Sequence, residues 1–304
     1  MIFHADNTPI QEINETLFED FDVKVFVKRL DLMHPQISGN KWFKLKYNLE
    51  EAKAQNKDTL LTFGGAYSNH ILAAAAIGKD YGFKTIGVIR GEEHLPLNPV
   101  LAFAKENGME LHYLDRDSYR IKEDKKFLQN LEKQFGIFYH IPEGGANSFG
   151  IKGCMEIVQE IEIPFDYIIH ECGTGTTLAG ISISLNNGQT AIGIPVLKGA
   201  EFLHQKILDM IKEYETAFGI IKENSSPKEN FKLFYDYHFG GYAKSNEALD
   251  SFIREFKIKH TIPIEPVFTG KLFYGVFDLI KQGYFKRGSS IVVIHSGGLF
   301  VERH

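Results

Sequence analysis

Short apolar runs alternate along the chain with longer segments of helical periodicity. Each run is four to six residues long and rich in β-branched side chains, which is typical of strands buried on both faces of a parallel sheet. The clearest runs are residues 59–63, 85–89, 167–170, 191–194 and 290–295. Between residues 42 and 54, apolar side chains recur at spacings of three and four, which predicts a helix with one apolar face. The alternation indicates an α/β fold with mostly parallel sheets.

Glycine-rich turns follow several of these predicted strands. Gly64-Gly65 follows the first run, Gly173-Thr174-Gly175 follows residues 167–170, and Gly297-Gly298 follows the last run. Each turn alone is typical of an ordinary connection between a strand and a helix. Together they favour a shared ligand-binding crevice, because open α/β sheets bind ligands at the carboxyl ends of their strands and glycine lets the backbone approach the ligand there.

A cluster of glycines at residues 142–145 interrupts the pattern and predicts a boundary between two units. We expect a smaller α/β domain at residues 47–147. The remaining segments, residues 1–46 and 148–304, then form a larger α/β domain.

The composition, with 43% hydrophobic and 24% charged residues among 304, is ordinary for a soluble globular protein. Its net charge of −5 argues against a nucleic-acid partner. Cys154 and Cys172 cannot form a disulfide framework, so we expect a reducing, cytoplasmic location. We expect no membrane span, because the most apolar stretch, residues 71–78, is far shorter than the roughly 20 residues required. No His-Glu-x-x-His or Cys-x-x-Cys motif is present, so we expect no metal site.

The first candidate for chemistry is Lys41, in the sequence Gly39-Asn40-Lys41. Asn40 is a good N-cap residue, which places Lys41 in the first turn of the predicted helix. The positive end of the helix dipole and the nearby Lys44 both disfavour a second positive charge there. Such surroundings lower the pKa of a lysine and make its amine nucleophilic, whereas a solvent-exposed lysine is the bland alternative.

The second candidate is the group Ser68, Asn69 and His70, which lies between Gly64-Gly65 and an alanine-rich helix. Ser68 or Asn69 could simply cap that helix. The same turn could instead present a hydroxyl, an amide and an imidazole to the crevice. The pattern differs from the Gly-x-Ser-x-Gly motif of serine hydrolases, so that chemistry has little support.

The third candidate is the turn at residues 173–177, which precedes a predicted helix. Backbone N–H groups and threonine hydroxyls at a helix N-terminus form a phosphate cradle. No Gly-Lys-Ser/Thr follows, so the turn is not a P-loop. It half-matches a dinucleotide fingerprint, but the spacing differs and the expected acidic residue is missing. A single phosphate therefore fits better than the pyrophosphate of an NAD-dependent oxidoreductase.

The chain resembles the fold-type II family of pyridoxal-phosphate enzymes in the order of four features. These are the lysine at a helix start, the Ser-Asn-His group, the glycine-threonine turn and a serine before Gly-Gly. Within it, the chain looks like the branch of 1-aminocyclopropane-1-carboxylate (ACC) deaminase and D-cysteine desulfhydrase. The matching phrases are Gly39-Asn40-Lys41 with Lys44-Leu45, Gly64-Gly65 with Ser68-Asn69-His70, Pro266-Val267 with Thr269-Gly270-Lys271, and His295-Ser296-Gly297-Gly298. The resemblance implies two open, mostly parallel twisted sheets flanked by helices, as in tryptophan synthase β. It also implies pyridoxal 5'-phosphate in the cleft between the domains and a homodimer.

The resemblance implies a role for each matching residue at the cofactor. Lys41 would form the Schiff base with the cofactor aldehyde, Asn69 would bind the ring 3-oxygen, and the hydroxyl of Ser296 would meet the pyridine nitrogen. Lys44 would add positive charge near the phosphate. The phosphate itself would be held by Gly173, Thr174, Gly175, Thr176 and Thr177. A neutral hydroxyl at the ring nitrogen predicts that this nitrogen is largely unprotonated, which suits α,β-elimination better than transamination.

On the substrate side, Ser68 would lie beside the substrate carboxylate and α-carbon and take part in catalysis. The rest of the substrate pocket would be formed by Asn69, His70, Tyr242, Phe268 and Thr269. Two of these positions depart from the ACC deaminases, which carry a tyrosine and a glutamate where this chain has Phe268 and Thr269. Phenylalanine has no phenol to help open the cyclopropane ring, and threonine does not replace a carboxylate.

These features predict a lyase or deaminase that acts on a small amino acid, in the manner of D-cysteine desulfhydrase, which releases pyruvate, sulfide and ammonia. The branch of D-cysteine desulfhydrase has threonine and serine at the positions of Thr269 and Ser296, but it also carries a tyrosine where this chain has Phe268. Two alternatives therefore stay open: ACC deaminase, and a cofactor-binding regulatory module with little activity.

Overall fold

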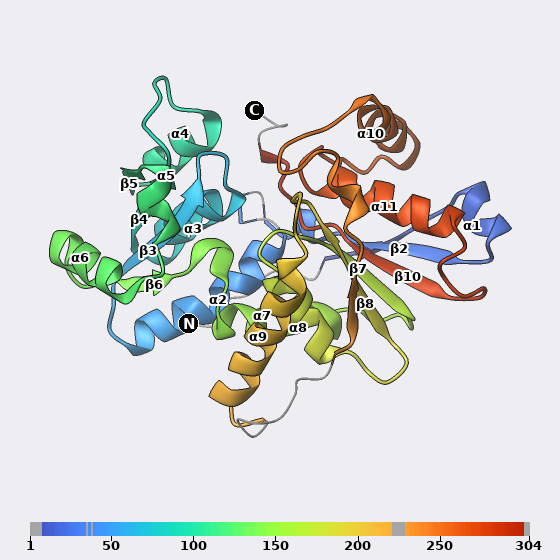
Figure 1. Cartoon of the computed structure of the whole chain (residues 1–304), viewed down its shortest axis with the longest axis horizontal. Helices are drawn as coiled ribbons and strands as arrows, with labels where there is room; N and C mark the ends of the chain where they lie inside the picture. Colours follow the sequence, from blue (N-terminus) through green and yellow to red (C-terminus); the bar gives the residue numbers. More distant parts are fainter. Residues whose placement is uncertain (1–7, 35, 38, 221–228, 301–304) are drawn as a thin grey trace.

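The computed structural model describes residues 8–34, 36–37, 39–220 and 229–300. Within these ranges the chain forms two separate sheets, which Figure 1 shows side by side. The larger sheet has six strands, in the order β1 (Ile10–Ile13), β2 (Lys24–Lys28), β10 (Ser290–Ile294), β7 (Tyr167–Cys172), β8 (Thr190–Pro195) and β9 (Phe231–Leu233). All neighbouring strands in it are parallel except β1 and β2.

The smaller sheet is entirely parallel. Its four strands follow the order β5 (Met109–Leu114), β4 (Lys84–Arg90), β3 (Thr59–Gly65) and β6 (Tyr139–Ile141). All five apolar runs predicted as strands are strands, and the predicted α/β class with two mostly parallel sheets is confirmed.

Helices cover both faces of the sheets. Those of five or more residues are α1 (Thr16–Asp20), α2 (Asn40–Ala54), α3 (Asn69–Tyr81), α4 (Pro99–Glu106), α5 (Arg116–Arg120), α6 (Lys125–Phe135), α7 (Ser148–Gln159), α8 (Thr176–Ser184), α9 (Phe202–Ala217), α10 (Glu247–His260) and α11 (Thr269–Lys281). Three short 3-10 turns are η1 (Leu30–Leu32), η2 (Glu143–Gly145) and η3 (Asp236–His238). In the described part of the chain, none of the helices combines the length and the apolar character needed to cross a bilayer.

Successive residues of the central strands enter different hydrophobic cores, as expected of strands buried on both faces. Ile168 and Val292 pack with residues of α2, α7, α8 and α9, whereas Ile169 and Val293 pack with residues of α1, α10 and α11. All four side chains are completely buried. This double burial explains why the strands are continuous apolar runs. The parallel pairing of β7 with β10 places their carboxyl ends next to each other.

The strands of the smaller sheet all lie between residues 59 and 141, and those of the larger sheet lie on either side of this segment. The glycines at residues 142–145 form the turn η2 directly after β6. This distribution supports the proposed division into a smaller domain at residues 47–147 and a larger one at residues 1–46 and 148–304.

Candidate active site

A cavity of about 480 Å³ lies where the carboxyl ends of strands from both sheets meet. From the smaller sheet, it is lined by the residues that follow β3 and by Arg90 at the end of β4. From the larger sheet, it is lined by the residues at the end of β7 and after β10. Ligand sites in open α/β folds occur at this edge of the sheet. The shared crevice predicted from the glycine turns is therefore present as a cavity between the two sheets.

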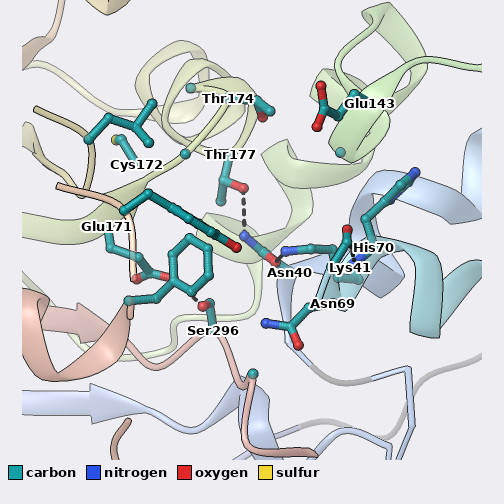
Figure 2. A pocket seen from close by; sticks show the side chains of 18 of the residues that line it. Asn40, Lys41, Asn69, His70, Glu143, Glu171, Cys172, Thr174, Thr177 and Ser296 are labelled. Carbon is teal, nitrogen blue, oxygen red and sulfur yellow. Dashed lines mark hydrogen bonds between the residues drawn. The ribbon is translucent and has the colours of Figure 1, made fainter. Parts of the chain in front are cut away.

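Lys41 reaches this cavity from the first turn of α2. Its Nζ donates a hydrogen bond to Asn40 Oδ1 at 2.6 Å, as Figure 2 shows beside Asn69 and His70. Burial and the positive charge of Lys44 lower the pKa of Lys41 from the usual lysine range. The lowered pKa gives Lys41 a larger share of neutral, nucleophilic amine near neutral pH than an exposed lysine has.

Asn40 holds the start of α2 against the larger sheet. Its Nδ2 donates to Thr177 Oγ1 at 3.0 Å, as Figure 2 shows. The same nitrogen lies 3.2 Å from His170 Nε2. The prediction that Asn40 is the N-cap was wrong. Gly39 is the N-cap, and it has a φ of 66° and a ψ of −144°, a backbone conformation that essentially only glycine adopts. Asn40 is thereby the first residue of the helix, and its side chain is free to orient Lys41.

The turn at residues 173–177 ends at an open helix N-terminus. Gly175 is the N-cap of α8 with a φ of 85°, and no side chain of the described residues caps this helix. Lys44 Nζ donates to Thr174 Oγ1 at 3.4 Å, which brings a positive charge to the turn. The uncapped N–H groups and Lys44 together form a site for an anion such as phosphate. Of the five residues predicted here, Thr176 is fully buried and does not line the cavity, whereas the other four do.

The group Ser68, Asn69 and His70 lines the opposite side of the cavity. Ser68 is the N-cap of α3, because its Oγ accepts hydrogen bonds from His70 N at 3.2 Å and Ile71 N at 3.4 Å. His70 Nε2 lies 2.8 Å from Thr62 Oγ1, and burial lowers its pKa to about 3. His70 is therefore neutral at physiological pH. Both interpretations of Ser68, as a helix cap and as a residue of the crevice, hold at once.

Phe268 and Tyr242 line the cavity and pack edge to face, with ring centroids 5.8 Å apart. Thr269 was predicted to line the substrate pocket, but its side chain does not line the cavity. It is fully buried, and its hydroxyl accepts from Glu265 N at 2.9 Å and bonds the Glu265 carboxylate at 3.2 Å. The reason is local: Thr269 is the first residue of α11, and its side chain turns inward to the loop that precedes the helix.

Ser296 lines the cavity directly after β10, and its Oγ donates to the carboxylate of Glu171 (Figure 2). Glu171 lies in β7 and is only 3% exposed. Neither Glu171 nor the role of Asn40 was predicted from the sequence. The available signal for Glu171 was a carboxylate at the end of an otherwise apolar strand, next to a glycine turn. In the described part of the chain, the acidic, histidine and cysteine side chains form no cluster suited to a metal ion.

A sequence model of the family described as "Pyridoxal-phosphate dependent enzyme" matches residues 2–297. The chain belongs to this family of pyridoxal-phosphate-dependent enzymes.

Several named proteins and a crystal structure are similar to this chain over most of its length. A protein of Pyrococcus horikoshii, provisionally named as an ACC deaminase, is 35% identical over 301 residues, which cover 96% of this chain and 89% of that protein. A D-cysteine desulfhydrase of Yersinia enterocolitica is 26% identical and covers 96% of this chain and 91% of its own length. A crystal structure described as an ACC deaminase homologue superposes with a TM-score of 0.84 at 33% identity, covering 96% of this chain and 90% of that one.

The residues of the cavity fit pyridoxal phosphate. An amine with a lowered pKa suits an aldehyde, and the uncapped start of α8 beside Lys44 suits a phosphate. Gly298 has a φ of 86°, and a Cβ there would lie 2.9 Å from Asn69 Nδ2, so a larger residue would displace this amide at the cavity wall. We propose that Lys41, Asn69, Ser296 and the turn at residues 173–177 hold the cofactor.

Proposed function

We propose that the protein catalyses α,β-elimination on a small amino acid, with D-cysteine as the substrate. In this reaction D-cysteine and water give pyruvate, hydrogen sulfide and ammonia. Membership of the pyridoxal-phosphate enzyme family supports the reaction class, and the relative named D-cysteine desulfhydrase supports the substrate. The observation that carries the proposal is Lys41, whose amine has a lowered pKa and lines the same cavity as the open turn at residues 173–177.

The side chains around the cavity can divide the work of elimination. Bound pyridoxal phosphate supplies an electron sink for the bonds at the substrate α-carbon. The amine of Lys41 can then take the proton from this carbon, because its lowered pKa favours the neutral form. The N-terminus of α3, beside Ser68, is placed to bind the substrate carboxylate through the helix dipole and the Ser68 hydroxyl. Phe268 and Tyr242, which pack against each other at the cavity wall, would form an aromatic side of the substrate pocket.

ACC deaminase activity is the second candidate, and the names of the Pyrococcus relative and of the similar crystal structure favour it. Opening the cyclopropane ring needs a group that adds to the ring or protonates it. Phe268 presents only a hydrocarbon ring at the cavity wall, and Thr269 is turned away into the protein. The chemistry of these two positions therefore supports elimination from D-cysteine over ring opening.

We also propose that the protein is a cytoplasmic homodimer. The family resemblance supports the dimer. Two free, buried cysteines, Cys154 and Cys172, support a reducing location.

The test is a substrate panel with purified protein loaded with pyridoxal phosphate. The panel contains D-cysteine, L-cysteine, D-serine, L-serine and ACC, with pyruvate, sulfide and 2-oxobutanoate as the measured products. We expect pyruvate and sulfide in equal amounts from D-cysteine, and little 2-oxobutanoate from ACC. Faster turnover of ACC than of D-cysteine would favour the second candidate. No product from any amino acid would favour a cofactor-binding regulatory module.

A further inference from the structure

Glu171 is a buried carboxylate in the wall of the cavity that the proposed mechanism does not use. It is 3% exposed, and its Oε1 accepts the hydrogen bond from Ser296 Oγ. Its Oε2 is buried and has no hydrogen-bond partner in the described part of the chain. Leaving a buried acidic group half satisfied costs free energy, so its presence at this point of the wall calls for a functional account.

A second buried glutamate nearby shows what a purely structural carboxylate looks like. Glu265 is 5% exposed, and its carboxylate accepts backbone N–H groups of Val267, Phe268 and Thr269 at 2.6 to 2.8 Å. These bonds satisfy the free N–H groups at the start of α11. Glu265 is therefore accounted for by the fold. Glu171 makes no comparable set of backbone bonds and faces the cavity through Ser296.

Among the described residues, five ionisable groups interact with Glu171 or lie next to it in the chain. They are Lys41 and Lys44 on α2, His170 and Cys172 on β7, and Glu265 on the loop before α11. Burial raises the pKa of Glu171, Glu265 raises it further, and Lys41 opposes the rise.

His170 cannot act as a cationic partner for Glu171, although its Nε2 lies 3.8 Å from Glu171 Oε1. Burial lowers the pKa of His170 well below its usual value. In addition, Asn40 Oδ1 accepts from Lys41, so the Asn40 amide directs its Nδ2 donor at His170 Nε2. This nitrogen is therefore an acceptor. Glu171 consequently has Ser296 as its partner, and it can exist as the neutral acid or as the anion.

We propose that Glu171 acts through Ser296 to set the protonation of the cofactor ring nitrogen. The inference rests on the proposed function and on the role that the family resemblance implies for Ser296, whose hydroxyl would meet this nitrogen. When the Glu171 acid gives its proton to Ser296 Oγ, the hydroxyl proton of Ser296 passes to the nitrogen. The result is a protonated nitrogen and a Glu171 carboxylate, with no net change in the number of protons. This replaces the expectation of an unprotonated nitrogen, which considered Ser296 alone. Ser296 backed by an acid supplies the positive charge that strengthens the electron sink and so speeds the elimination.

The test measures the ring nitrogen directly by ¹⁵N NMR of the enzyme loaded with ring-¹⁵N-labelled pyridoxal phosphate. We expect the wild type to show the chemical shift of a protonated pyridine nitrogen at neutral pH. Glu171→Gln retains the shape and an acceptor for Ser296 but carries no transferable proton, so its nitrogen moves to the unprotonated shift. Ser296→Ala gives the same change by breaking the relay, and Ser296→Thr retains the wild-type shift because it retains the hydroxyl. In turnover of D-cysteine, Glu171→Gln lowers kcat by at least about tenfold with little change in KM.

Glu143→Gln is the matched control, because Glu143 is another carboxylate of the cavity wall but pairs with Lys122 at 3.3 Å. We expect it to leave the ¹⁵N shift unchanged. An unprotonated nitrogen in the wild type, or equal shifts in the wild type and Glu171→Gln, would overturn the inference while leaving the proposed function intact. A protein that binds no cofactor at Lys41 would overturn both. If Glu171→Gln fails to fold, the comparison of Ser296→Ala with Ser296→Thr decides.

Discussion

Gly39, the residue before α2, lies directly against the backbone of the segment after β10. Replacing Gly39 with alanine adds one methyl group and tests how closely the two segments must approach. A Cβ at Gly39 would lie 1.5 Å from the carbonyl oxygen of Ser296, whereas ordinary contacts of a Cβ begin at 3.4 Å. Gly39→Ala must therefore move the two segments apart by about 2 Å, the difference between these distances. These segments carry Lys41 and Ser296, which we propose contact opposite ends of the cofactor.

The expected loss of activity follows from that displacement. A misplacement of 1 Å in a catalytic group can cost about 100-fold in rate, so we expect kcat with D-cysteine to fall at least about 100-fold in Gly39→Ala. The backbone adds a cost of about 1–3 kcal/mol in the free energy of unfolding, because its φ of 66° and ψ of −144° disfavour alanine.

Gly82→Ala separates the two effects. Gly82 ends α3 with a φ of 73° and a ψ of 31°, and no atom of the described residues lies within 4 Å of a Cβ there. We expect this variant to lose about 1–2 kcal/mol in the free energy of unfolding and to retain its activity. Urea unfolding, absorbance of the bound cofactor and steady-state kinetics are measured on both variants. If Gly39→Ala retains activity within a few-fold of Gly82→Ala, the close approach of the segments that carry Lys41 and Ser296 is not required for activity.

Three further changes probe separate parts of the site. Lys44→Gln removes a positive charge that lowers the pKa of Lys41 and lies beside Thr174, so the pH of half-maximal cofactor loading rises and the affinity for pyridoxal phosphate falls. An unchanged pH profile in an absorbance titration would contradict this. Phe268→Tyr places a phenol at the cavity wall, so we expect 2-oxobutanoate production from ACC to rise at least about tenfold, and no rise would show that this position does not limit ring opening. Burial lowers the pKa of His70 from 6.5 to about 3, so the unfolded state binds more protons than the folded state between these pH values. The free energy of unfolding therefore falls with decreasing pH, by up to about 1.4 kcal/mol per pH unit. His70→Gln flattens this slope in urea unfolding, and an identical slope in the variant would show that His70 does not cause it.

The sheets could be predicted from the sequence because burial on both faces leaves a direct mark. The run at residues 167–170 is apolar because Ile168 and Ile169 enter different cores. A strand with one face in solvent would instead alternate apolar and polar residues. The order of strands in each sheet could not be predicted, because an apolar run does not specify its neighbour.

The site was predicted where a short motif carries the chemistry and missed where the partners are far apart in the sequence. Lys41, Ser68 and the turn at residues 173–177 each lie in such a motif, and the structure places all three at one cavity. Glu171 was missed because its partner, Ser296, lies 125 residues away. Thr269 was misplaced because a motif gives the position of a residue along a helix but not the direction of its side chain, which is set here by Glu265.

Lys41 is proposed to form the covalent link to the cofactor, and trapping that link is the decisive experiment. The loaded protein is reduced with borohydride, digested, and mapped by mass spectrometry, with Lys41→Ala as the control. We predict a stable pyridoxyl adduct on the peptide containing Lys41 in the wild type and no adduct in Lys41→Ala. An adduct on another lysine, such as Lys44, or no adduct in fully loaded wild-type protein, would contradict it.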